Sequence, residues 1–219
     1  MGSSMARKSW VRSVCNMLLF EVSFDGWSPL GSPKFIMVWQ DHIPKEIQSL
    51  YEVRDYRHAA AILAKEFAGE FNELCSALTA FRFTQRDVTT PGGNESQIPK
   101  KFSRLLRPMG WEEKSLTAKV MVDEMEVSYD THKVDYIKGR VAFDLEWNSK
   151  DQTFDRDLYA FRAFFEYNKI SVGVLVTRSN DLDPWIDSLG SYVDSNGKKR
   201  MYKEKYGAST THLGKLIPR

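Results

Sequence analysis

An apolar run near residue 140 carries two acidic side chains, and no other stretch of the sequence constrains the fold as strongly. Arg140 to Trp147 has the alternation typical of a β-strand, which puts Asp144 and Glu146 on one face. The opposite face is apolar, with Val141, Phe143, Leu145 and Trp147. Asp135 precedes the run, and a Lys-Gly pair between them can fold it back beside the two acids. Three converging carboxylates repel one another, and a bound divalent cation would remove that cost.

The residues that follow predict a helix and a second strand. Asp155 to Asn168 has apolar side chains at helical spacing, and Thr153 and Asp155 are candidates for its N-terminal cap. Its aromatic side chains Phe161, Phe164 and Phe165 are expected in the core rather than in a platform for stacking bases. Ile170 to Thr177 is rich in β-branched residues, so a strand–helix–strand unit with parallel, buried strands is expected.

The rest of the chain predicts further helices and one more strand. From Pro44 to Leu78 the apolar spacing indicates two helices divided near Gly69. Helices are also expected at 98–109 and 181–189, a strand and turn at 117–127, and a mobile polar segment at 190–207. Residues 37–219 are therefore predicted to form one α/β domain, and residues 1–36 an appendage of unknown role.

Composition and charge exclude several classes of protein. The 219 residues carry a formal net charge of only +2, so the overall charge does not by itself indicate a nucleic-acid partner. Cys15 and Cys75 have neither zinc nor disulfide spacing, which indicates free, buried thiols in a reduced, cytoplasmic protein. No apolar run reaches the roughly 20 residues of a membrane span, so no membrane partner is expected. There is also no phosphate-binding loop, dinucleotide fingerprint or hydrolase nucleophile elbow.

The acids suit a magnesium site. Mg²⁺ takes oxygen ligands, commonly one or two carboxylates together with substrate phosphate. On this hypothesis Asp135 and Asp144 are metal ligands, and the Leu145 carbonyl supplies a third oxygen. Glu146 then holds or deprotonates the attacking water. The alternative is that Asp144 and Glu146 merely line the solvent-facing side of an amphipathic strand.

Two groups of basic residues are candidates for contacts with phosphate. The first group lies on the helix expected at 98–109 and comprises Lys100, Lys101 and Arg104, for which the alternative is a solvated charged face. The second group is expected to lie near the acids and comprises Lys133, Lys138 and Lys150.

The pattern around the acids also carries a resemblance. It consists of Asp135-Tyr-Ile-Lys-Gly-Arg-Val-Ala-Phe-Asp144-Leu-Glu146-Trp, followed by Asp155-Arg-Asp-Leu-Tyr and Lys169-Ile-Ser-Val-Gly-Val. Together these segments resemble the catalytic core of the BglII/BstYI group of type II restriction endonucleases, with BamHI a more distant relative. The group belongs to the PD-(D/E)xK nucleases, whose motif lysine is replaced in this branch by Glu or Gln. Glu146 stands at that position here.

The resemblance implies a restriction-endonuclease-like α/β fold with a mixed central β-sheet flanked by helices. It implies Mg²⁺-dependent hydrolysis of double-stranded DNA by a homodimer that leaves 5′-phosphates. Asp135 and Asp144 would be the metal ligands and Glu146 the water-activating residue. Glu113, shortly after Trp111, is the nearest match to a further catalytic polar residue of relatives.

The sequence departs from the group in three places. Asp144 replaces the commoner Glu, Asp135 is not preceded by Pro, and relatives continue past the Lys-Leu-Ile-Pro-Arg segment into a further strand. A C-terminal strand is therefore expected to be lacking.

By analogy with the group, base contacts are expected in Thr89 to Gln97 and in Tyr206 to Lys215, which includes Thr210 and His212. Two other functions stay open. One is a structure-specific or repair nuclease with the same acids, and the other is a non-catalytic DNA-binding or interaction protein that retains the fold.

Overall fold

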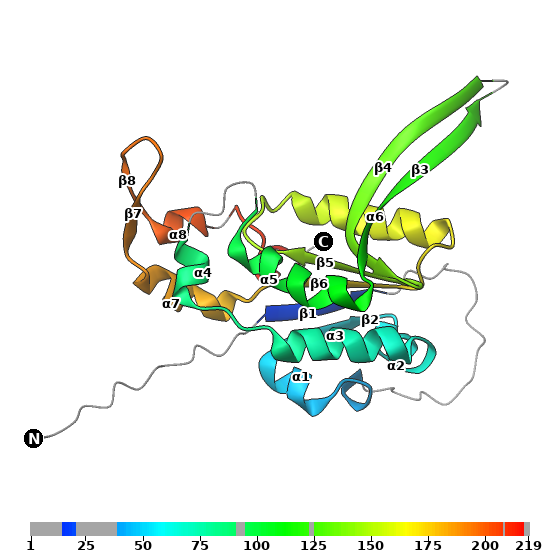
Figure 1. Cartoon of the computed structure of the whole chain (residues 1–219), viewed down its shortest axis with the longest axis horizontal. Helices are drawn as coiled ribbons and strands as arrows, with labels where there is room; N and C mark the ends of the chain where they lie inside the picture. The colour runs from blue at the N-terminus through cyan, green and yellow to red at the C-terminus, as the bar shows by residue number, and fades with distance from the viewer. Residues whose placement is uncertain (1–14, 21–38, 91–94, 123–124, 208, 217–219) are drawn as a thin grey trace, which may run out of the picture.

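A mixed six-stranded β-sheet organises the part of the chain that the computed structural model describes (Figure 1). The backbone is described for residues 15–20, 39–90, 95–122, 125–207 and 209–216, and the side chains for the same residues except 15–20 and 116–132. The strand order is β2-β1-β6-β5-β4-β3. The strands are β1 (Cys15–Phe20), β2 (Val53–Tyr56), β3 (Glu112–Val122), β4 (Met125–Lys138), β5 (Val141–Glu146) and β6 (Val172–Arg178). β5 runs parallel to β6, and β4 antiparallel to β5, so the predicted mixed sheet and parallel unit are confirmed.

Helices cover both faces of this sheet. One face carries α1 (Lys45–Leu50), α2 (Ala59–Glu66), α3 (Ala68–Ala80) and α5 (Gln97–Leu106), and α6 (Thr153–Glu166) covers the other (Figure 1). Shorter elements are η1 (Trp39–Asp41), α4 (Gln85–Thr89), η2 (Arg107–Met109), η3 (Asn180–Leu182), α7 (Asp183–Ser188), α8 (Tyr202–Lys205) and α9 (Leu213–Leu216). β7 (Ser191–Val193) and β8 (Lys199–Met201) form a separate two-stranded sheet. None of the described helices combines the length and the apolar character needed to cross a membrane.

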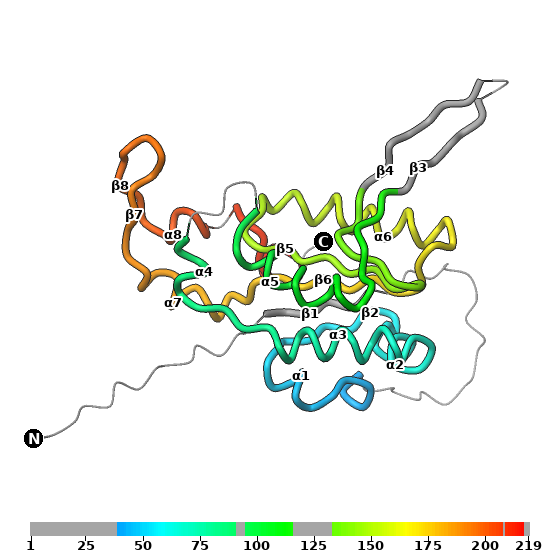
Figure 2. Tube along the Cα trace, viewed as in Figure 1, coloured from blue at the N-terminus to red at the C-terminus, as the bar shows by residue number. Residues whose placement is uncertain are grey.

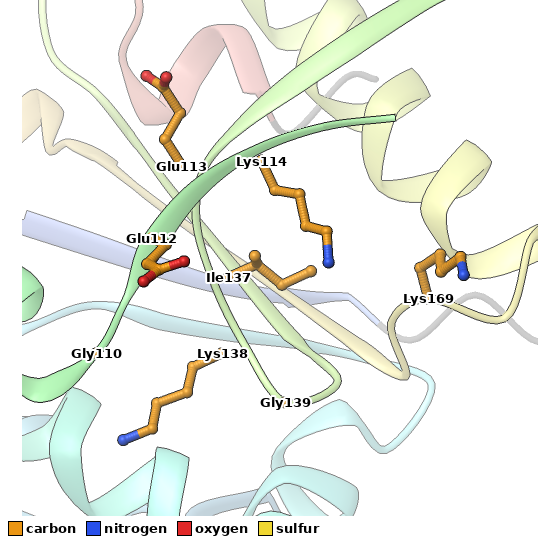
Figure 3. A pocket seen from close by; sticks show the side chains of 8 residues that line it. All are labelled: Gly110, Glu112, Glu113, Lys114, Ile137, Lys138, Gly139 and Lys169. Carbon is orange, nitrogen blue, oxygen red and sulfur yellow. The ribbon is translucent and has the colours of Figure 1, made fainter. Parts of the chain in front are cut away.

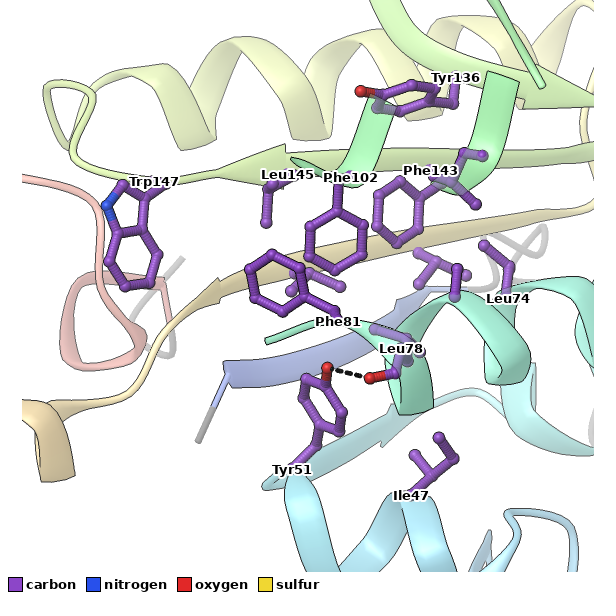
Figure 4. Packing of buried hydrophobic residues seen from close by; sticks show 14 of the residues in the cluster. Ile47, Tyr51, Leu74, Leu78, Phe81, Phe102, Tyr136, Phe143, Leu145 and Trp147 are labelled. Carbon is purple, nitrogen blue, oxygen red and sulfur yellow. Dashed lines mark hydrogen bonds between the residues drawn. The ribbon is translucent and has the colours of Figure 1, made fainter. Parts of the chain in front are cut away.

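Each face of the sheet has its own apolar core, because β5 and β6 bury both of their faces. In the larger core, the Phe102 ring of α5 lies 5.7 Å from the Phe143 ring of β5 and 4.2 Å from the Phe81 ring, between centroids (Figure 4). In the smaller core, Phe161 of α6 packs with Leu175 of β6. The predicted core role of the α6 aromatic residues is therefore confirmed.

The tight turn between β4 and β5 returns the chain directly beside itself. Lys138 pairs with Val141, so Gly139 and Arg140 form a two-residue hairpin loop. Gly139 has a φ of 53°, a conformation that the first position of such a loop commonly needs and that glycine adopts without steric cost. A side chain at Gly139 would also meet Glu70, since an added Cβ would lie 2.5 Å from its Oε1. The Lys-Gly turn predicted to bring Asp135 back is thus present.

β1 corrects the prediction that residues 1–36 are an appendage. It lies inside the sheet, parallel to β2 and antiparallel to β6, with Leu18 opposite both Arg54 and Leu175. The prediction was wrong for these six residues because their short apolar run pairs with strands far away in the sequence. The other residues of that predicted appendage lie outside the described part of the chain.

Several predicted boundaries also differ from the structure. Val53, assigned to a helix, begins strand β2, and the helices divide at Phe67, which leaves Gly69 inside α3. The single strand expected at 117–127 is the end of β3 and the start of β4. α6 begins at Thr153, and its N-cap, Gln152, makes no side-chain capping hydrogen bond.

The polar segment 190–207, which the sequence predicts to be mobile, contains regular secondary structure. It folds into the β7–β8 hairpin and α8, because Asp194 organises the turn between the two strands. The Asp194 Oδ1 accepts hydrogen bonds from the backbone N–H groups of Asn196 and Lys198, at 3.0 and 2.9 Å.

Candidate active site on strands β4 and β5

Asp144 and Glu146 are buried acids. Both project from β5 on the face opposite Phe143 and Leu145, which belong to the larger core. Only 2% of Asp144 and 5% of Glu146 is exposed. The alternative that these carboxylates line a solvated strand face is therefore wrong, because α6 covers that face. Buried carboxylates cost folding free energy, so their presence here calls for a chemical reason.

Asp135 lies directly beside them, as predicted. Its backbone N–H donates a 2.7 Å hydrogen bond to the Asp144 Oδ1, just beyond the last β4–β5 pair, Tyr136 with Phe143. A register shift between β3 and β4 falls at this point, because two residues of β4 lie opposite Glu113 alone. Such bulges often re-aim side chains beside active sites. The Asp135 side chain keeps contact with solvent, unlike the other two acids.

A fourth carboxylate, Asp157, joins the three acids that the sequence predicts at this site. It lies on α6 and is 2% exposed, and its charge acts on Asp135, Asp144 and Glu146. Its neighbour Arg156 donates from Nε and Nη2 to the Asp157 Oδ1, at 3.1 and 3.0 Å. The available sequence signal was an acid at a core-facing position of an amphipathic helix, since Asp157 lies three residues after Phe154 and four before Phe161.

Burial and mutual repulsion raise the pKa values of the acids. Burial first, then the charges of Asp135 and Asp157, put the pKa of Asp144 well above its usual range. Burial, followed by the charge of Asp157, raises the pKa of Glu146 to about 9, against a lowering hydrogen bond from Ser149. Protein around the Asp135 carboxyl also desolvates it in part, and with the charge of Asp157 this raises its pKa to about 6. The cluster thus holds protons at neutral pH unless a cation compensates its charge.

Each of the two acids on β5 has one oxygen without a hydrogen-bond partner among the described residues. Among the described side chains, the Asp144 Oδ2 and the Glu146 Oε2 are buried without a hydrogen bond. No three or more His, Cys, Asp or Glu side chains of the described residues form a ready-made metal cage. The candidate ligands are instead two acidic side chains, Asp135 and Asp144, which leave room for further oxygen ligands. Mg²⁺ is commonly held in this way, by one or two carboxylates together with substrate phosphate. Leu145 lies beyond the last β4–β5 pair, Tyr136 with Phe143, and so has no partner on β4.

Glu113 and Lys133 form an ion pair at the rim of this cluster. The Lys133 Nζ lies 2.5 Å from the Glu113 Oε2, and about half of each side chain is exposed. Both charges act on Asp135, where Glu113 raises the pKa and Lys133 lowers it. The structure therefore brings Glu113 and Lys133 into the neighbourhood of the acids.

Lys138 does not lie near the acids, so its predicted position is wrong. Its Nζ donates to the Glu73 Oε1 at 2.6 Å and to the Met109 carbonyl at 2.7 Å. Alternation along β4 turns it away from Asp135 and towards α3. A pocket of about 510 Å³ lies beside it, and Figure 3 shows Lys138 and Glu113 pointing in opposite directions there.

The basic residues of α5 lie on the other face of the sheet from α6. Lys101 forms an ion pair within the protein, since its Nζ lies 2.6 Å from the Asp87 Oδ2. Arg104 is exposed and Lys100 is half-buried. Their contact with phosphate stays a prediction.

The C-terminal segment lies beside the end of β5 (Figure 2). Lys150 and Thr210 form an isolated antiparallel bridge, and the Thr211 N–H donates to the Ser149 carbonyl at 2.9 Å. The His212 Nδ1 lies 3.2 Å from the Asn180 Oδ1, in the turn that follows β6. Of the other segment predicted to read bases, residues 91–94 lie outside the described part of the chain.

Buried Arg178 fixes this C-terminal segment. It is 1% exposed, forms a 2.5 Å ion pair with Asp183, and donates to the Tyr206 carbonyl at 3.1 Å. A buried guanidinium needs such partners, because leaving its N–H groups unpaired costs several kcal/mol, on the order of 2–5.

Comparison with known families agrees with the geometry of this site. The model of the family described as "Restriction endonuclease BglII/BglIII" matches residues 51–219. None of the curated proteins matches the sequence. The match spans the acids of β4 and β5, helix α6 and the C-terminal segment. The chain therefore belongs to the BglII/BglIII family of restriction endonucleases.

Proposed function

We propose that this protein is a type II restriction endonuclease that hydrolyses phosphodiester bonds of double-stranded DNA with Mg²⁺ and leaves 5′-phosphates. The observation that carries the proposal is the buried pair of acids on β5. Asp144 is tied to the Asp135 backbone, and one oxygen of each acid has no hydrogen-bond partner in the described part of the chain. Family membership supports the same activity. A protein with no use for these charges would fold more stably with apolar residues in their place.

The acids take different roles in this proposal. Asp135 and Asp144 hold the metal, and the Leu145 carbonyl supplies a further oxygen. Bound Mg²⁺ would polarise the scissile phosphate and lower the pKa of a water molecule. Glu146, whose Oε2 makes no hydrogen bond to any described residue, orients that water and accepts its proton. Glu113 acts from the rim through its ion pair with Lys133.

The protein is expected to act in the cytoplasm as a homodimer, in which each subunit cuts one strand. Exposed Lys150 beside the end of β5 is expected to contact a phosphate, and Thr210 and His212 to approach bases.

Asp144→Ala should lower cleavage of duplex DNA in Mg²⁺ by a factor on the order of 10³, because one metal ligand is worth several kcal/mol of transition-state stabilisation. Binding of the same duplex in Ca²⁺ should persist, because most of that affinity comes from phosphate contacts. Asp187→Ala, which removes an exposed carboxylate on α7, is the matched control and should cut like the wild type.

Plasmid DNA as substrate separates the candidate functions. Discrete bands support sequence-specific restriction, whereas cleavage only at flaps, nicks or other irregular structures indicates a repair nuclease. Binding without any cleavage by the folded wild type in Mg²⁺ or Mn²⁺ would show that the fold serves a non-catalytic role. Equal cleavage by the wild type and Asp144→Ala would exclude the proposed mechanism.

A further inference from the structure

Arg156, in the first turn of α6, places a positive charge beside two of the buried acids, Glu146 and Asp157. Its guanidinium donates twice to the buried Asp157, and its Nη2 lies 3.7 Å from the Glu146 Oε1. Although 55% of the Arg156 side chain is exposed, its charged end is fixed between two carboxylates that are 7% and 2% exposed at the side chain. This arrangement differs from an ordinary surface ion pair, in which both partners are mobile and solvated.

The position of this guanidinium depends on the packing of α6. Phe154 and Phe161, on either side of Asp157 along the helix, are buried in the smaller core. Asp157 therefore cannot rotate into solvent without disturbing that core, and it holds Arg156 in one orientation. The charge of Arg156 acts on Asp135 and Glu146 as well as on Asp157, and Lys133 adds a second positive charge near Asp135.

We propose that Arg156, held by Asp157, is a positioning residue that fixes Glu146 for the attacking water and occupies, in part, the electrostatic role of the metal before the metal binds. The inference rests on the proposed nuclease function and goes beyond it, because it assigns to one residue opposite effects on metal binding and on DNA cleavage. Arg156 weakens the binding of divalent cations to the protein alone, and it raises the rate at which bound DNA is cut.

The sign of each effect follows from the geometry. A positive charge a few ångström from the acids reduces the net negative charge that attracts Mg²⁺, so its removal should tighten metal binding on the order of tenfold. Arg156 contacts the Glu146 Oε1, and Oε2 is the oxygen that has no hydrogen-bond partner among the residues described. Without Arg156 the Glu146 carboxylate loses this orientation, and a group misplaced by about 1 Å can cost on the order of 100-fold in rate. A residue that only stabilised the fold would weaken both metal binding and cleavage.

The test compares Arg156→Gln with Arg162→Gln. Arg162 lies on the same helix, is 71% exposed and pairs with Glu166 at 3.8 Å, so it controls for the loss of a charge from α6. Mg²⁺ binding is measured by calorimetry without DNA, and cleavage by single-turnover kinetics on duplex DNA at saturating Mg²⁺. Arg156→Gln should bind Mg²⁺ about tenfold more tightly and cut about 10- to 100-fold more slowly. Arg162→Gln should match the wild type in both measurements.

Arg156→Lys provides a second test that does not need the glutamine variant to fold. It keeps the charge but loses the two-pronged contact with Asp157, so Mg²⁺ affinity should stay near that of the wild type while cleavage slows. Weaker or unchanged Mg²⁺ binding by a folded Arg156→Gln overturns the proposal, as does wild-type cleavage by both Arg156 variants. If the wild type itself neither binds Mg²⁺ nor cuts DNA, the proposed function fails first and the inference falls with it.

Discussion

The burial of Asp144 and Glu146 lowers the free energy of unfolding of the metal-free protein when the pH is high enough to ionise these two acids. Both residues are almost fully covered, and their raised pKa values reflect desolvation first and neighbouring charge second. An acid with a raised pKa keeps its proton in the folded state while the unfolded chain releases it. Folding is therefore opposed as the pH rises through that interval, which is the opposite of a salt-bridged surface acid.

Glu146→Gln should stabilise the metal-free protein at alkaline pH. Glu146 is protonated in both states below its usual pKa of 4.5, and between 4.5 and about 9 only the folded state retains the proton. The free energy of unfolding of the wild type should thus fall across this window, whereas the amide, which mimics the neutral acid, contributes no such slope. Thermal unfolding in a chelator should show Glu146→Gln higher by several degrees at about pH 9, with the difference from the wild type shrinking towards zero as the pH falls below 4.5.

Glu166→Gln is the control for this comparison, because the Glu166 carboxylate is 41% exposed on α6 and pairs only with exposed Arg162 in the described structure. Its melting temperature should follow that of the wild type across this pH range. A parallel pH dependence in the wild type and Glu146→Gln would contradict the interpretation that ionised Glu146 opposes folding.

Among the elements, helix α6 connects the fold to the site. It follows β5 directly, covers the acid-bearing face of the sheet and carries Arg156 and Asp157. Its approach to β6 is close, since a Cβ added at Gly173 would lie 2.6 Å from the Phe161 ring. The distance between α6 and the acids therefore depends on a glycine that is remote from the chemistry.

Gly173→Ala should destabilise the protein by about 1–3 kcal/mol, because a methyl group there overpacks the contact with Phe161. Gly69→Ala in α3 is the matched control, since an added Cβ meets nothing within 4 Å. That substitution should be neutral or stabilise the helix by up to about 1 kcal/mol. Urea unfolding of the two variants measures both effects, and equal midpoints would show that α6 can shift away from β6 without cost.

For the molecule as a whole, β1 joins β2 to the rest of the sheet, because it lies between β2 and β6. The larger core depends on this position of β1, because residues of β2 and β6, the strands on either side of it, contribute to that core. Leu18 pairs in both directions, so its strand has no free edge on which a missing N–H would be tolerated.

Leu18→Pro should therefore destabilise the whole domain by about 3 kcal/mol or more, which is a large part of the stability of a typical domain. Lys199→Pro in the separate β7–β8 sheet tests the same substitution away from the main sheet and should disturb only that hairpin. Circular dichroism and thermal unfolding distinguish the two outcomes. A cooperative, wild-type-like transition for Leu18→Pro would mean that β1 contributes little to the fold.

The sequence by itself determined the local elements and the chemistry of one strand. The alternation of Val141 to Glu146 placed both acids on one face, the Lys-Gly turn brought Asp135 back, and the motif pointed to the family that the comparison then showed. These features are visible because they depend on period and turn residues within a short window.

Tertiary structure alone decided what surrounds the acids. Whether Asp144 and Glu146 face solvent or a covering helix depends on the packing of α6, and alternation is the same in both cases. Asp157 and the buried Arg178 likewise gain their partners from distant parts of the chain, and β1 gains its place by pairing with strands that begin at Val53 and Val172. The burial of a side chain, the interaction between charges and the order of the strands all depend on contacts between segments that are distant in the sequence. No local sequence pattern specifies them.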